Sequence, residues 1–93
     1  MDSLQRLARD VTVKNSHGLH ARTAALLVKA ANRFESEISL ERDGNPVNAK
    51  SIMGVLMLAA AQGTVLRLSA EGPDAEAAVA ALSALFERGF DET

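Results

Sequence analysis

Apolar residues along this 93-residue chain recur with a period that switches between two residues, as in strands, and about 3.6 residues, as in helices. This pattern constrains the fold most strongly. Residues 9–14 alternate, with Val11 and Val13 on one side, which predicts a half-buried strand. Residues 15–18 have the composition of a loop. The period then becomes helical, so we expect a helix over residues 21–33.

The helix expected over residues 21–33 has an apolar stripe on one side, with Lys29 and Arg33 opposite. The members of this stripe are Leu26, Leu27, Ala30, Ala31 and Phe34. A helix of this kind buries its apolar side against the rest of a domain.

A hairpin and a short helix are expected in the middle of the chain. Residues 37–49 alternate around a turn at 43–46, where Gly and Asn tolerate positive φ, and this predicts a hairpin with a short second strand. Ser51 is suited to cap the N-terminus of a short helix that runs to about residue 58.

The last part of the chain predicts one more strand and one more helix. Residues 66–70 alternate again, and Gly63 separates them from the preceding helix. Pro73 is suited to the first turn of a final helix, and Gly89 is suited to end it. The apolar stripe of this helix consists of Ala78, Val79, Leu82, Leu85 and Phe86.

The predicted order is βαββαβα, which indicates an α+β two-layer open-faced sandwich in a single domain over residues 1–93. The first six elements also match a ferredoxin-like order. Topology alone therefore assigns no function.

Composition excludes several classes of function. The chain has no cysteine, so it has neither disulfides nor thiolate metal sites. Its net charge is −2 and it lacks Trp and Tyr, which disfavours nucleic-acid binding. The longest apolar run, residues 52–61, is too short for a bilayer, which requires about 20 residues. The N-terminus lacks the apolar core of a signal peptide, so we expect a cytoplasmic protein. The chain also lacks a Walker loop and a dinucleotide fingerprint, and we expect no cofactor.

The strongest candidate for chemistry is His20, at the junction between a loop and the helix that follows. The backbone N–H groups of Ala21, Arg22 and Thr23 have no intrahelical acceptor and attract anions. Arg22 adds a permanent positive charge, and Gly18 permits a tight bend. A neutral imidazole is a good nucleophile near neutral pH. The group therefore suits transient phosphorylation of His20, although spacing alone also fits a histidine that only caps the helix.

His17 lies three residues before His20, a spacing that raises the question of a metal site. A metal needs more ligands than two histidines, and no Asp, Glu, Cys or third His lies nearby in the sequence. We therefore interpret His17 as a loop residue that is able to contact His20 or a bound phosphate.

The short helix after Ser51 is apolar nearly all round. It is either an ordinary core helix or a helix that leaves part of its surface exposed for a partner. In the second case, the exposed residues come from Ile52, Met53, Val55 and Leu56. Ser51 is either a plain N-cap or a phosphorylation site beside this patch.

With Gly18-Leu19-His20-Ala21-Arg22 and Lys50-Ser51-Ile52-Met53-Gly54-Val55 both present, the chain resembles HPr. HPr is the histidine-containing phosphocarrier of the bacterial phosphoenolpyruvate-dependent sugar phosphotransferase system. The likeness runs from about residue 11 to residue 86. It implies a four-stranded antiparallel sheet in the order 1-4-2-3 with three helices on one face.

The resemblance also implies partners. His20 would accept a phosphoryl group from phosphorylated enzyme I and pass it to the A components of sugar permeases, with assistance from Arg22. Ser51 resembles the serine that an HPr kinase/phosphorylase modifies. The docking surface would consist of the helix over residues 51–58 and the first turns of the helix over residues 21–33, together with Lys29 and Lys50. We expect the protein to be a monomer.

One residue departs from the family pattern. Thr23 stands where the family usually has Pro directly after the active-site arginine. Because Thr has an N–H and a hydroxyl, we expect it to offer the phosphate an extra donor in a less rigid turn.

Three alternatives stay open at this point. A regulatory or nitrogen-related paralogue would use the same histidine with other acceptors. A pure interaction module would display the helical patch without histidine chemistry. A ferredoxin-like RNA or ligand binder is disfavoured by the charge and by the missing aromatic residues.

Overall fold

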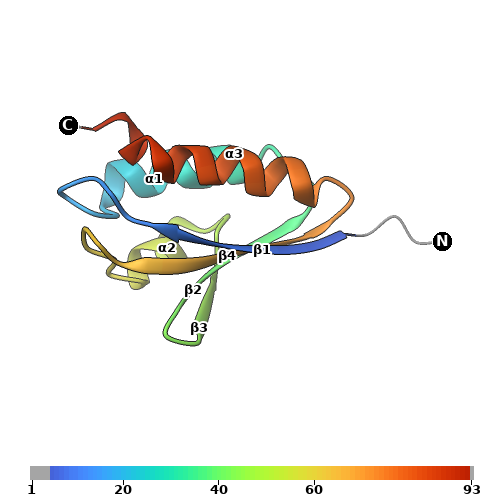
Figure 1. Cartoon of the computed structure of the whole chain (residues 1–93), viewed down its shortest axis with the longest axis horizontal. Coiled ribbons are helices and arrows are strands. Elements are labelled where there is room, and N and C mark those ends of the chain that lie inside the picture. Colours follow the sequence, from blue (N-terminus) through green and yellow to red (C-terminus); the bar gives the residue numbers. More distant parts are fainter. Residues whose placement is uncertain (1–4, 93) are drawn as a thin grey trace.

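The computed structural model describes residues 5–92, which form a four-stranded antiparallel sheet with helices on one face (Figure 1). The strand order is β1-β4-β2-β3, which confirms the expected order and fold class. The strands are β1 (Gln5–Thr12), β2 (Glu37–Arg42), β3 (Asn45–Asn48) and β4 (Val65–Gly72).

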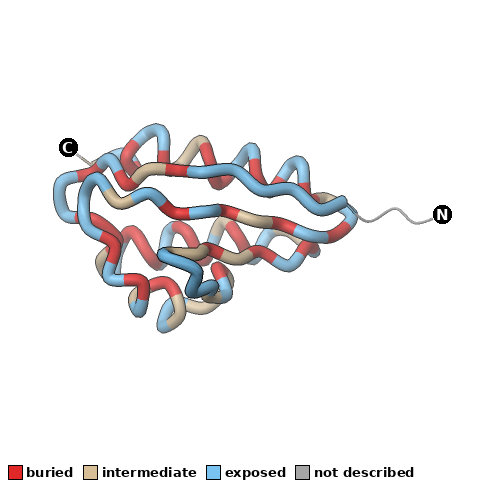
Figure 2. The backbone as a smooth tube through the Cα atoms, turned by 60° about the horizontal axis from the view of Figure 1, so that its bottom comes forward, coloured by how far each residue is buried: buried red, intermediate tan, exposed pale blue. Residues whose placement is uncertain are grey.

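The central strand β4 shows why the sheet has one covered and one open face. Its even-numbered residues are buried and its odd-numbered residues are half-buried or exposed, and Figure 2 shows this alternation along the backbone. Strand β1 pairs with β4 from Gln5 opposite Gly72 to Thr12 opposite Val65, so it begins four residues earlier than expected. Residues 5–10 are all exposed, so backbone pairing rather than side-chain burial defines this part of the strand.

The helices are α1 (Ala21–Ala31), α2 (Ile52–Met57) and α3 (Ala75–Glu87), followed by the 3₁₀ turn η1 (Gly89–Asp91). Helices α1 and α3 lie side by side above the sheet in Figure 1. Helix α1 ends before residue 33 because the Asn32 side chain donates to the carbonyl of Val28 over 2.9 Å. Pro73 lies in the turn before α3 and not in its first turn, because Asp74 is the N-cap residue.

The buried side of α1 differs from the expected stripe. Leu26 is 42% exposed, and Ala30 and Phe34 are only partly buried. The buried residues of the helix are Thr23, Ala24, Leu27, Val28 and Ala31. Apolar residues occur on both sides of this helix, so the sequence leaves two adjacent stripes to choose from, and packing on the sheet selects the second.

The turn that connects α1 to β2 is joined to the start of α3 through one carboxylate, that of Asp74. Asp74 accepts hydrogen bonds from the backbone N–H of Glu35 at 2.9 Å and of Ser36 at 2.9 Å. The Ser36 hydroxyl donates to the same carboxylate over 2.6 Å, and this bond is the main cause that lowers the pKa of Asp74. These bonds fix the position of α3 relative to the sheet.

None of the helices within residues 5–92 has the length and apolar content needed to cross a membrane.

Candidate functional site

His20 is the N-cap residue of α1, as the sequence predicts. Its backbone is extended, with φ −112° and ψ −173°. The ring Nδ1 accepts a hydrogen bond from the backbone N–H of Arg22 over 3.2 Å. The side chain is 34% exposed, so it is open to a partner while lying at the positive end of the helix dipole.

The loop before α1 holds His20 against the chain that follows α2. The backbone N–H of Leu19 donates to the carbonyl of Ala60 over 2.9 Å, and that of Gly18 donates to Asn15 over 3.2 Å. Gly18 has φ +70°, and a Cβ at this position would lie 2.5 Å from the Ala60 oxygen. Only glycine fits this close approach without a shift of the backbone.

The most unexpected member of the site is Glu92, 72 residues after His20. Its Oε2 accepts from the His20 ring Nε2 at 2.9 Å and from the Arg22 guanidinium, at 3.0 Å from Nη2 and 3.3 Å from Nε. Its Oε1 accepts from the side-chain amide of buried Asn15 at 2.9 Å. The Glu92 side chain is only 11% exposed. One carboxylate therefore joins the loop, the histidine and the arginine.

These contacts fix the ionisation of Glu92 and the tautomer of His20. The hydrogen bond from Asn15, followed by those from His20 and Arg22, lowers the pKa of Glu92 to about 2. An ionised carboxylate only accepts hydrogen bonds, so Nε2 of His20 carries the proton. Nδ1, which accepts from the Arg22 N–H, consequently carries the lone pair.

A sharp backbone reversal after α3 brings Glu92 to this place. Gly89, Phe90 and Asp91 all have positive φ, at 60°, 57° and 60°. Phe90 is buried and packs edge-on against Phe86, with ring centroids 5.0 Å apart. Figure 1 shows the red end of the chain at the same end of the molecule as the loop before α1. The sequence gives Gly89 as a helix end, but no local signal reveals where the chain goes next.

His17 lies next to the site without a direct bond to His20. The two rings are edge-on with centroids 6.1 Å apart, and His17 is exposed. His17, Arg22 and Glu92 line one shallow cleft. Within residues 5–92, no group of three or more His, Cys, Asp or Glu side chains is placed to hold a metal ion.

The arrangement has counterparts among known proteins. Residues 7–88 match the family described as PTS HPr component phosphorylation site. The phosphocarrier protein HPr of Xylella fastidiosa strain Temecula1 is 51% identical over 86 residues, which cover 92% of this chain and 97% of that protein. The chain belongs to the HPr family. An HPr crystal structure from Thermoanaerobacter tengcongensis has a TM-score of 0.90 at 49% identity, covering 94% of this chain and 98% of that one. The HPr-like protein Crh of Bacillus subtilis is 51% identical over 74 residues, covering 80% of this chain and 87% of that protein.

Membership of the HPr family establishes the general function. The chain is a phosphocarrier of the sugar phosphotransferase system, which carries a phosphoryl group on a histidine and is not an enzyme with its own turnover.

Thr23 stands at the position where Pro is usual in the family, and its contacts differ from those expected from the sequence. Its side chain is fully buried, and its hydroxyl accepts from the His20 N–H at 3.0 Å. The hydroxyl donates to the carbonyl of Gly18 at 3.1 Å, and the carbonyl of His20 is a second acceptor at 3.2 Å. The hydroxyl thus ties the turn together, and whether the turn is less rigid than it would be with Pro stays a prediction. The hydroxyl also faces the interior, so only the N–H of Thr23 is left as an extra donor to a phosphate.

Helix α2 supplies the exposed apolar surface expected of an HPr docking patch, with two changes in its membership. Ile52 is 44% exposed and Met53 is 70% exposed. Val55 is fully buried, so its inclusion in the patch was wrong, and Leu56 is half-buried. A six-residue helix presents one side to the core, and Val55 lies on that side. Met57, at 77%, is exposed instead.

Ser51 is the N-cap residue of α2, as expected. Its Oγ accepts from the backbone N–H of Gly54 at 3.1 Å, and the side chain is partly exposed beside Ile52.

The two lysines of the expected docking surface differ in their contacts. Lys29 is exposed in the last turn of α1. The Nζ of Lys50 donates to the carbonyl of Phe34 at 2.7 Å, so this lysine is tied to the end of α1. Lys29 is therefore the freer of the two cations.

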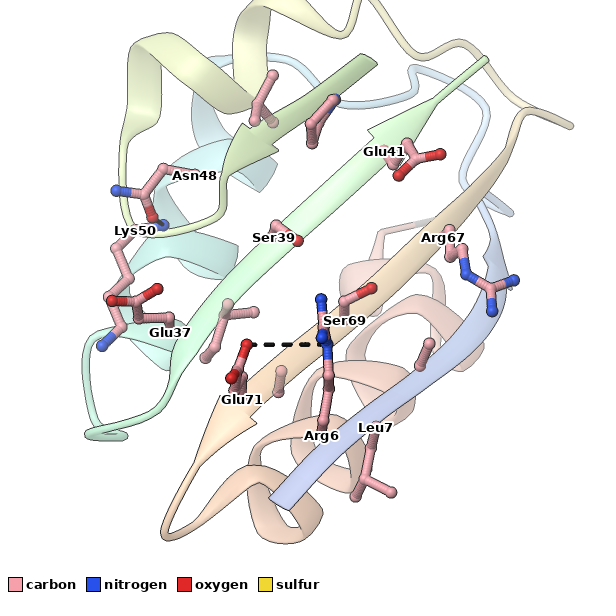
Figure 3. A pocket seen from close by; sticks show the side chains of 15 residues that line it. Arg6, Leu7, Glu37, Ser39, Glu41, Asn48, Lys50, Arg67, Ser69 and Glu71 are labelled. Atoms are coloured by element: carbon pink, nitrogen blue, oxygen red, sulfur yellow. Dashed lines mark hydrogen bonds and ion pairs between the residues drawn. The ribbon is translucent and has the colours of Figure 1, made fainter. Parts of the chain in front are cut away.

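The open face of the sheet has a broad depression that lies apart from the phosphocarrier site (Figure 3). Small side chains, Ser39 and Ser69, form its floor, and charged residues such as Arg6 and Glu71 surround them. The Arg6 guanidinium and the Glu71 carboxylate are 3.8 Å apart and both are exposed. An exposed pair of this kind contributes little to stability.

Proposed function

We propose that the phosphoryl acceptor is His20 and that the bond forms at Nδ1. Nδ1 carries the lone pair because Nε2 donates its proton to Glu92. Attack by Nδ1 on the phosphorus of a phosphorylated donor protein forms the N–P bond, while the electron pair of the broken bond stays with the donor atom. Nε2 keeps its proton, so the ring becomes cationic.

The new phosphoryl dianion needs hydrogen-bond donors and positive charge, and four donor groups lie in the first turn of α1. The Arg22 N–H already points at Nδ1 and is able to donate to a phosphoryl oxygen. The Arg22 guanidinium is 75% exposed and lies beside the ring, where it is a further candidate donor to the phosphoryl oxygens. The N–H groups of Ala21 and Thr23 in the same first turn extend this anion-binding set.

We propose enzyme I as the donor and the A components of sugar permeases as the acceptors. Both would dock on the surface around His20, which combines Ile52 and Met53 of α2 with Leu26 and the exposed cation Lys29 of α1. Met and aliphatic side chains adapt to several partners in turn, as a carrier requires. The family assignment also supports the cytoplasmic location and the single HPr-like domain expected from the sequence.

Ser51 is proposed as a regulatory phosphorylation site for an HPr kinase/phosphorylase. Its hydroxyl is at the N-terminus of α2, where the helix amides tolerate a phosphate. The added charge would lie beside Ile52 and Met53 and weaken docking to the apolar patch.

Intact mass before and after incubation with enzyme I and phosphoenolpyruvate tests the acceptor. The wild type is expected to gain one acid-labile phosphate, and His20→Ala is expected to gain none. His17→Ala is the matched control, because it removes an exposed imidazole 6.1 Å away and is expected to retain the label. Labelling of His20→Ala would exclude His20 as the acceptor.

The identity to Crh keeps a second function open, that of a regulatory paralogue. Such a protein would use the same docking surface but deliver phosphate to regulators, or act through Ser51. Transfer from the phosphorylated protein to sugar-permease A components, measured against a regulatory acceptor, distinguishes the two.

A further inference from the structure

The Glu92 carboxylate occupies the charged partners that a phosphoryl group on His20 also needs. It holds the Arg22 guanidinium through two bonds of 3.0 and 3.3 Å to the same oxygen. It also accepts the ring proton of His20 at 2.9 Å. The Glu92 carboxylate and a phosphoryl group on His20 therefore compete for the same arginine.

The carboxylate is held in place by more than its charge. Its other oxygen accepts from Asn15, a residue that is buried and also donates to the Gly18 carbonyl at 2.8 Å. The three residues before it have left-handed backbones, and Phe90 anchors them in the core. Strained backbone of this kind persists where surrounding contacts determine it, and it gathers at functional sites.

We infer that Glu92 raises the phosphoryl-transfer potential of His20 by stabilising the unphosphorylated form through Arg22. The inference rests on the proposed function, because it takes Nδ1 of His20 as the acceptor. It assigns Glu92 as a positioning residue, which acts through the arginine rather than on the phosphorus.

Coulomb's law indicates which contact decides the effect. After transfer, the Glu92 carboxylate attracts the cationic ring through the Nε2 contact of 2.9 Å and repels the phosphoryl dianion, which has the larger charge but lies farther away, so these two interactions largely offset each other. The exchange of Arg22 does not cancel, because the guanidinium must weaken its bonds to Glu92 in order to bind the dianion. Glu92 therefore favours the unphosphorylated protein.

The solvent exposure of the Glu92–Arg22 ion pair sets the expected size of the shift in the exchange equilibrium. Glu92 is largely covered, whereas the arginine is 75% exposed, so solvent screens the pair. We expect Glu92→Gln to shift the exchange equilibrium with enzyme I about fivefold toward the phosphorylated form, the upper range for an exposed ion pair. Gln retains an oxygen for the His20 ring but has no charge for the guanidinium.

The test measures the equilibrium constant for phosphoryl exchange between phosphorylated enzyme I and the wild type, Glu92→Gln and Glu87→Gln. Glu87 is the matched control, because it is an exposed carboxylate at the end of α3 that pairs with Lys14 at 2.9 Å. We expect a shift in Glu92→Gln and none in Glu87→Gln. An unchanged constant, or a shift toward the unphosphorylated form, would overturn the inference.

A double-mutant cycle with Arg22→Met tests the route through the arginine. The effect of Glu92→Gln should vanish in the Arg22→Met background, whereas an effect that persists there would contradict competition for Arg22. His20→Ala is included in the same series. If it takes up phosphate, the proposed acceptor fails, whereas an unlabelled His20→Ala with an unchanged constant in Glu92→Gln refutes the role of Glu92 alone.

Discussion

The backbone N–H of His20 donates to the hydroxyl of Thr23 over 3.0 Å, and the His20 ring in turn accepts from the first-turn amides. This reciprocal arrangement is a capping box in which a histidine takes the usual place of Ser or Thr. It couples the orientation of the reacting ring to the first turn of α1.

Removal of the Thr23 hydroxyl should therefore destabilise the protein. Thr23→Val keeps the volume and leaves the His20 N–H without its partner, while the Gly18 carbonyl keeps only the hydrogen bond from Asn15. We expect a loss of about 1–3 kcal/mol in the free energy of unfolding, the usual cost of unsatisfied buried groups. Urea unfolding measures it.

Thr23→Ser is the control for this prediction, because it retains the hydroxyl and loses only a methyl group. It should lie closer to the wild type than Thr23→Val. If the two variants are equally stable, the hydroxyl does not tie the turn together.

A second prediction concerns Gly18, whose left-handed backbone brings the loop against Ala60. Gly18→Ala places a Cβ 2.5 Å from the Ala60 oxygen at φ +70°. The cost should exceed the about 1–2 kcal/mol of a left-handed alanine alone, because the loop must also shift. Both the midpoint of urea unfolding and the rate of phosphorylation by enzyme I should fall.

Gly63→Ala separates the cost of a left-handed alanine from the cost of the clash with Ala60. Gly63 has φ +91°, but no atom lies within 4 Å of the added Cβ, so this variant incurs the conformational cost without the clash. Enzyme I should phosphorylate this variant at the wild-type rate. Equal loss of stability in both alanine variants would mean that the contact with Ala60 does not matter.

The sequence predicted the parts of the site that are local and missed the part that is not. The N-cap position of His20 and the nearby Arg22 follow from neighbouring residues, because the end of a helix is determined within a few positions. Glu92 was missed because its place depends on three left-handed residues and on the burial of Phe90. Val55 was assigned to the exposed patch because a helix that is apolar all round does not reveal which side faces the core.

The depressed pKa of Glu92 predicts an acid-dependent loss of stability. The pKa falls from an ordinary 4.5 to about 2 in the folded protein, so the ionised carboxylate stabilises the fold above about pH 4.5. This stabilisation is lost as the pH falls toward 2. The difference in Tm between the wild type and Glu92→Gln should therefore shrink over this range, as measured by thermal unfolding.

Asp74 also has a lowered pKa, but both proteins in this comparison contain it, so its contribution cancels from the difference. A Tm difference that stays constant between pH 5 and pH 2 would show that the Glu92 carboxylate contributes no net stability when it is ionised.

The last prediction concerns the exposed patch on α2. Met53 is 70% exposed, so Met53→Glu should change the free energy of unfolding by no more than about 0.5 kcal/mol, as is usual for surface substitutions. If partners dock on this patch, the new charge must be desolvated against an apolar surface. We expect the KM of enzyme I for the protein to rise on the order of tenfold, the effect of about 1.4 kcal/mol in binding, with little change in kcat.

Val65→Glu is the matched control for Met53→Glu, because Val65 is 56% exposed but lies on the open face of the sheet. Both variants add one negative charge to the surface, so a general effect of charge on association would appear in both. A selective rise in KM for Met53→Glu locates docking on α2. An equal rise in both variants, or none in Met53→Glu, would exclude Met53 from the contact.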